Sequence, residues 1–121
     1  MYNNNNTNSM VKRDIFKYDG VEYDMLIGED RVDNWLLLDA SVASDVWFHI
    51  EGLPSAHVIL KSSGGRVHRK VIKRAAYLCK IHSSARRLAR CEVIYTPVCN
   101  LSKGSVQGSV ITGFGVKSVS T

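Results

Sequence analysis

The second half of this chain is nearly free of acidic residues. Residues 61–121 contain twelve lysines and arginines but a single acid, Glu92, whereas residues 1–60 carry ten acids against four bases. Halves of opposite charge neutralise each other in part when they fold together, but eleven excess cations exceed six excess anions. We therefore expect a strongly positive surface that binds an acidic partner.

Features of several other protein classes are missing as well. No apolar run approaches the roughly 20 residues that span a bilayer, so we expect no membrane partner. The three cysteines form no CxxC pair, which argues against a disulfide framework and a metal site. The same pattern indicates a reducing compartment, and we expect the cytoplasm. There is no GKS or GKT phosphate loop, so we expect neither a cofactor nor a small-molecule substrate.

The chain of 121 residues is long enough for one domain with a single core. Residues 1–10 are polar and rich in asparagine, and we expect them to be disordered, with the domain covering residues 11–121. Hydrophobic periodicity predicts the α+β class: a mostly antiparallel sheet with one short helix and one longer basic helix. Asp19-Gly20 lies between two strand-like segments and indicates a two-residue type I′ hairpin.

The remaining elements follow from apolar runs and breaker residues. The second strand of the hairpin is expected to end at Gly28, and Asp33 or Asn34 to cap a short helix near residues 34–42. Further strands are expected at residues 45–50, 56–61, 91–96, 109–112 and 116–119.

Residues 66–82 show the clearest helical period in the chain. Apolar side chains gather on one side of this helix, whereas the other side is basic apart from Tyr77. Like charges at this spacing destabilise an isolated helix by about 0.3 kcal/mol per pair, and bound phosphates would relieve the repulsion. Tyr77 either stacks on an unpaired base or only covers the helix. The predicted phosphate contacts are Arg66, Arg69, Lys70, Lys73, Arg74 and Lys80, assisted by Arg86, Arg87 and Lys103.

A histidine pair is predicted in the middle of the chain. If Ile50 pairs with Ala56 across the intervening loop, His49 lies opposite His57 in adjacent strands. We favour a structural role in which both imidazoles are partly buried and bond the backbone. Contact with nucleic acid and metal binding or catalysis remain as alternatives, although no third metal ligand is evident.

Several short motifs together resemble the NFACT-R domain family. They occur in family order over about residues 20–115 and include Asp45-Val46-Trp47-Phe48-His49, Val93-Ile94-Tyr95-Thr96 and Gln107-Gly108. The positions of this chain that match the family motifs are Asp33, Asn34, Asp45, Trp47, Phe48, His49, His57, Tyr95, Thr96, Gly104 and Gly108. Two positions depart from the pattern: Ala56 replaces the usual glycine before the histidine, and Gln107 replaces a proline, which we expect to loosen that turn.

The resemblance implies RNA binding without catalysis. The large members of the family are ribosome quality-control factors that act on stalled large subunits, so the implied partner is tRNA or ribosomal RNA. DNA is the other polyanion that the charge fits. We expect a stand-alone member similar to the eukaryotic coiled-coil-tailed proteins but without the tail.

These observations predict a nucleic-acid-binding module rather than an enzyme. The surface of Trp47, His49 and His57 is expected to shape a groove beside the basic helix. The alternatives are a metal-assisted nuclease that uses the histidine pair and an adaptor that docks on an acidic protein.

Overall fold

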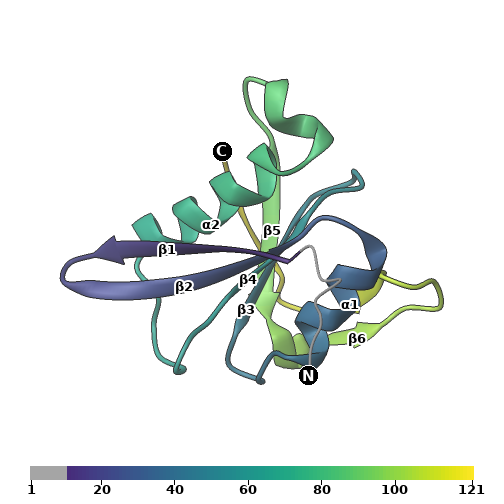
Figure 1. Ribbon diagram of the computed structural model, residues 1–121, viewed down its shortest axis with the longest axis horizontal. Helices are drawn as coiled ribbons and strands as arrows, with labels where there is room; N and C mark the ends of the chain where they lie inside the picture. The colour runs from purple at the N-terminus through teal and green to yellow at the C-terminus, as the bar shows by residue number, and fades with distance from the viewer. Residues whose placement is uncertain (1–10) are drawn as a thin grey trace, which may run out of the picture.

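A six-stranded antiparallel sheet forms the centre of the protein in the computed structural model, which describes residues 11–121 (Figure 1). The strands follow the order β1-β2-β4-β3-β5-β8, and β6 and β7 form a separate two-stranded ribbon. The strands are β1 (Lys12–Tyr18), β2 (Val21–Gly28), β3 (Val46–Ile50), β4 (His57–Leu60), β5 (Glu92–Pro97), β6 (Leu101–Lys103), β7 (Val110–Thr112) and β8 (Lys117–Ser120). The predicted α+β class is confirmed, whereas the disorder expected for residues 1–10 concerns residues outside the described part.

Two helices accompany the sheet, α1 (Arg31–Asp39) and α2 (Arg69–Ile81). Short 3-10 turns follow α2 and β5, namely η1 (Ser84–Arg87) and η2 (Val98–Asn100). Neither helix has the length and hydrophobicity that a bilayer crossing requires, as far as residues 11–121 show.

The hairpin of β1 and β2 closes as the sequence predicts. Asp19 and Gly20 have φ angles of 52° and 77°, and Tyr18 pairs with Val21 directly beside them. Positive φ at both central residues is the requirement of a type I′ turn, which aspartate and glycine meet at low cost. The hairpin extends well beyond the rest of the sheet and lies along α2 (Figure 1).

The start of α1 differs from the prediction. Asp30, not Asp33 or Asn34, is the cap: its Oδ1 accepts a hydrogen bond of 2.9 Å from the Asp33 backbone N–H. Asp33 and Asn34 therefore lie in the first turn, and both are buried. All three residue types are good caps, so local sequence could not decide among them. Gly28, two residues before the cap, leaves room for α1 to pack close to β2.

The register of β3 and β4 confirms the predicted histidine pair. Trp47 pairs with Ile59 and Phe48 with Val58, so His49 comes opposite His57, and their ring centroids are 4.9 Å apart.

These two interior strands bury side chains on both faces of the sheet. Phe48 and Ile50 of β3 pack with α2, together with Val58 and Leu60 of β4. The intervening side chains point to the opposite side, where Trp47 packs with residues of α1 and of the β6–β7 ribbon. α2 and α1 accordingly cover opposite faces (Figure 1).

The basic helix begins three residues later than the periodicity predicts. His68 caps it, because its Nδ1 accepts a hydrogen bond of 3.0 Å from the backbone N–H of Lys70. The predicted apolar face is the buried one, and Val71, Ala75 and Cys79 have no exposed surface. At the C-terminal end the predicted strands at β5, β7 and β8 are confirmed, whereas β6 was not predicted.

The loop between β6 and β7 rests on the first turn of α1. The Trp35 indole N–H donates to the Ser109 carbonyl at 2.9 Å. Gly108 has a φ of 88°, and a Cβ there would come within 2.6 Å of the Arg31 Cα. Only glycine allows this contact.

We expect Gly108→Ala to lower the free energy of unfolding by about 3 kcal/mol, since it combines left-handed backbone strain with a backbone clash. Gly52→Ala is a matched control, because Gly52 has a φ of 75° and a methyl group added there would meet nothing within 4 Å. This control should cost about 1 kcal/mol. Urea unfolding of both variants measures the difference, and equal losses would contradict the packing role of Gly108.

Candidate nucleic-acid interface

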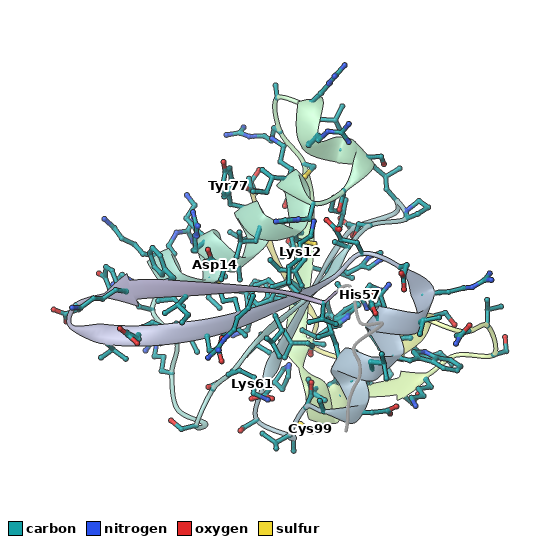
Figure 2. All side chains as sticks on the ribbon, in the orientation of Figure 1. Lys12, Asp14, His57, Lys61, Tyr77 and Cys99 are labelled. Carbon is teal, nitrogen blue, oxygen red and sulfur yellow. The ribbon has the colours of Figure 1, made fainter. Side chains whose placement is uncertain are left out.

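The outer face of α2 carries the predicted basic surface. Arg69, Lys70, Lys73 and Tyr77 are exposed on this helix, and Figure 2 shows Tyr77 pointing away from the sheet. Arg86 and Arg87 continue the exposed cations beyond the end of the helix in η1. The structure thus brings most of the predicted phosphate contacts onto one side of the molecule.

Two of the predicted contacts already hold a carboxylate. Arg74 donates two hydrogen bonds to Asp14 on β1, at 3.0 and 3.3 Å. Lys103 lies on β6, packed with α1 instead of α2, and its Nζ is 2.6 Å from Asp39 Oδ1. Arg74 therefore joins the hairpin to α2, and Lys103 joins the ribbon to α1.

The other predicted cations differ from Arg74 and Lys103 in this respect. Within residues 11–121 no ion pair involves Arg66, Arg69, Lys70, Lys73, Lys80, Arg86 or Arg87. We call these seven residues the basic surface.

Tyr77 is 46% exposed and lies beside the paired arginine. The guanidinium carbon of Arg74 is 5.7 Å from the Tyr77 ring centroid and 5.8 Å from that of Phe16. The tyrosine thus has a cation–π contact within the protein while part of its ring stays open to solvent.

A basic groove that the sequence did not predict lies at the start of α2. Its volume is about 830 Å³, and Arg66, Arg69 and Lys117 line it together with Tyr95. Lys117 lines this groove because β8 pairs with β5, which places Lys117 opposite Tyr95. Nothing in the local sequence of an isolated lysine near the end of the chain indicates this neighbour.

Several motif residues have structural roles. Asp45 is 1% exposed and accepts hydrogen bonds of 3.0 Å from the backbone N–H groups of Val42 and Ser62, and one from Lys61. Burial alone would raise the pKa of Asp45, but these bonds outweigh it and lower the pKa. Phe48 stacks on Tyr95 at 5.4 Å.

Two further motif positions support loops. Asn100 donates to the Thr96 hydroxyl at 3.0 Å, and a Cβ at Gly104 would lie 2.3 Å from the Ser109 hydroxyl.

All the remaining motif residues except Asp33 line a second groove of about 710 Å³ on the α1 face. Its lining includes Asn34, Trp47, His49, His57 and Gly108. The expectation that the Trp47, His49 and His57 surface adjoins the basic helix is therefore wrong. Side chains alternate along β3, so Trp47 and His49 point to the face opposite the one that α2 covers.

The partners of the two histidines determine which ring nitrogen of each carries the proton. Trp47 Nε1 lies 3.0 Å from His57 Nδ1, and an indole N–H can only donate, so the neutral His57 carries its proton on Nε2. His49 Nδ1 lies 2.6 Å from the Ile50 carbonyl oxygen, which can only accept. His49 therefore keeps its proton on Nδ1 and presents Nε2 as an acceptor.

Both imidazoles are neutral near physiological pH. Burial lowers the pKa of His57 to about 3, and the neighbouring His49 contributes to this lowering. Burial also lowers the pKa of His49, against the opposing effect of its bond to the Ile50 carbonyl. In the described part of the chain, no third histidine, cysteine or carboxylate joins this pair in a metal-binding group.

A comparison with known protein families agrees with the resemblance that the motif residues indicate. Residues 12–116 match the NFACT protein RNA binding domain. The chain belongs to this family. The NFACT-R domain is an RNA-binding domain with no known catalytic activity, so the family assignment supports binding as the function.

The NFACT-R domain of this chain has curated relatives in several eukaryotes. It is 33% identical over 86 residues to coiled-coil domain-containing protein 25 of Mus musculus, covering 67% of this chain and 41% of the mouse protein. It is 32% identical over 103 residues to the Dictyostelium discoideum homologue of that protein, covering 79% and 50%. Protein JLP2 of Saccharomyces cerevisiae is 32% identical over 89 residues, covering 67% and 43%. The chain thus spans half or less of the length of these relatives.

A solved structure shares the fold. The C-terminal part of the fibronectin/fibrinogen-binding protein from Streptococcus suis superposes with a TM-score of 0.80, at 24% sequence identity. The match covers 95% of this chain and 46% of that one.

The buried His57 makes the stability of this NFACT-R domain depend on pH. Between pH 7 and 5 the unfolded histidine, with a pKa near 6.5, takes up a proton that the folded one does not, so stability falls as the pH falls. We expect this group to remove about 2 kcal/mol over that interval. Urea unfolding at several pH values measures this loss, which should be about 2 kcal/mol smaller in His57→Gln; an equal loss in both proteins would contradict the burial of a neutral imidazole.

Proposed function

We propose that this domain binds structured RNA of the translation machinery, tRNA or ribosomal RNA, through the basic surface on α2 and η1. The observation that carries this proposal is the absence of acidic partners for its seven cations within residues 11–121. The choice of translation RNA rests on the family, whose large members act on the ribosome.

The basic surface is arranged to contact a phosphate backbone. Lys70 and Lys73 are three residues apart, and Arg69 and Lys73 four apart, so these cations are neighbours on one face of α2. Their mutual repulsion destabilises the isolated helix, and the buried apolar face offsets this cost in the folded protein. Phosphate contacts remove the repulsion and release the condensed counterions of the RNA.

The groove at the start of α2 extends this surface to β8. Arg66 and Arg69 line it with Lys117, and no acidic residue is part of its lining. The exposed part of the Tyr77 ring adds a place on which an unpaired base can stack. Recognition in this arrangement depends on backbone charge and shape rather than on base edges.

Salt dependence tests the proposal directly. Affinity for a labelled tRNA and for a ribosomal RNA hairpin, measured by fluorescence anisotropy over a range of KCl concentrations, should fall linearly on a log–log plot. Neutralising Lys70, Lys73, Arg86 and Arg87 to glutamine should reduce the slope by about 0.7–0.9 per lost contact.

The control is the single variant Lys17→Gln, which removes an exposed cation of β1 that lies outside the basic surface. It should leave the slope nearly unchanged. A slope near zero in the unmodified protein would contradict the phosphate contacts. Partners that survive nuclease treatment in a pull-down, together with such a slope, would favour docking on an acidic protein.

Lys73 and Arg74 are adjacent on α2 and provide a matched pair. Lys73→Gln should weaken RNA binding with little change in stability, since Lys73 is exposed and has no acidic partner. Arg74→Gln should do the reverse, because it breaks the two bonds to Asp14 and lowers the free energy of unfolding by about 1 kcal/mol. Anisotropy and urea unfolding of both variants measure the two effects, and the opposite assignment would contradict the geometry.

A further inference from the structure

The groove on the α1 face contains a buried amide that has no hydrogen-bond partner among residues 11–121. Asn34 is 6% exposed, and its Oδ1 is buried without a hydrogen-bond partner. In the described part of the chain no group bonds its Nδ2 either. Folded proteins seldom keep a buried amide unpaired, because desolvation costs free energy that no hydrogen bond returns.

Gly28 determines where this amide lies. A Cβ at Gly28 would come within 2.7 Å of Asn34 Oδ1 and 2.9 Å of Leu37 Cδ1, so only glycine lets α1 pack this closely on β2. Gly28 also pairs with His57 on β4. The backbone therefore holds the Asn34 amide in the neighbourhood of the buried histidine.

His57 contributes a second unpaired polar group to the same groove. It is 4% exposed, its Nδ1 is taken by Trp47, and no protein group in residues 11–121 accepts from its Nε2–H. His49, which is half-buried beside it, presents the bare Nε2 as an acceptor. The groove thus offers a fixed donor, a fixed acceptor and a free amide, with no charge on any of the three.

We propose that this groove binds the polar edge of one unpaired nucleobase. Each nucleobase presents hydrogen-bond donors and acceptors side by side on its pairing edge, and an asparagine amide can bond such an edge through both of its polar atoms. A groove of about 710 Å³ is in the size range of small-ligand sites. The inference rests on the proposed RNA binding and assigns it a second contact, one that reads base chemistry.

The surroundings argue against two other occupants. Glu29 and Asp30 line the groove against a single cation, Arg31, so a phosphate group is disfavoured. An extended peptide usually pairs with a free strand edge. The strands that carry the groove, β2, β4, β3 and β5, each have a neighbour on both sides in the sheet and leave no such edge.

Uncharged nucleosides provide the test, because they lack the phosphate on which the basic surface acts. Uridine, cytidine, adenosine and guanosine are titrated into the labelled protein while the imidazole nitrogen and ring proton signals of His49 and His57 are followed by NMR. At least one nucleoside should shift the His57 Nε2 signal in a saturable way, and acetamide at the same concentration should not. No shift with any nucleoside, or an equal response to acetamide, would overturn the base site.

Asn34→Leu has a similar shape without the amide and separates a binding role from a structural one. It should weaken nucleoside binding by about tenfold or more while Tm stays equal or rises, since the variant no longer buries an unpaired amide. A lower Tm with unchanged nucleoside binding would overturn the role of Asn34. The titration of the unmodified protein decides the base site without any variant.

Lys73→Gln is the matched control on the other face, and it should leave nucleoside binding unchanged. Nucleoside binding without salt-dependent RNA affinity would contradict the basic surface alone. Salt-dependent RNA affinity without nucleoside binding would contradict the base site alone. The failures of the two proposals are therefore distinguishable.

Discussion

The alternation of side chains along β3 and β4 is the constraint on which the rest of the structure depends. Both strands lie inside the sheet, so successive residues must enter different layers. Phe48 anchors the core beneath α2, while Trp47 anchors the smaller core beneath α1. A shift of one residue in their pairing would exchange these layers, with the histidines turned toward α2 and the large apolar side chains toward the polar groove.

Acidic residues of the first half of the chain form ion pairs with only some of its cations. Acids from the first half neutralise cations that join elements: Asp14 holds Arg74, Asp45 holds Lys61 and Asp39 holds Lys103. The outward cations of α2 and η1 receive none of these acids. The acids of the first half therefore connect elements of the fold, and in the described residues the cations of the basic surface stay unpaired.

Features set by neighbouring residues could be predicted from the sequence. The Asp19-Gly20 turn, the amphipathic pattern of α2 and the β3–β4 register all follow from local rules, and the structure confirms them. Asp30 was missed as the cap of α1 because Asp33 and Asn34 nearby are equally good capping residue types. The pairing of Lys117 with Tyr95 and the placement of the histidines away from α2 depend on contacts between distant segments. Propensity and periodicity do not contain that information, because a helix can cover either face of a sheet.

The position of Gly28 between Asn34 and His57 has a consequence for how this fold diversifies. The polar groove and the cations of α2 share no side chain, because they lie on opposite faces of the sheet. Substitutions on α2 can change the affinity for a polyanion without changing the shape of the groove. Substitutions around Gly28 can change the groove without changing the charge of α2. Descendants of one ancestral domain are thus free to keep one surface while they lose or replace the other.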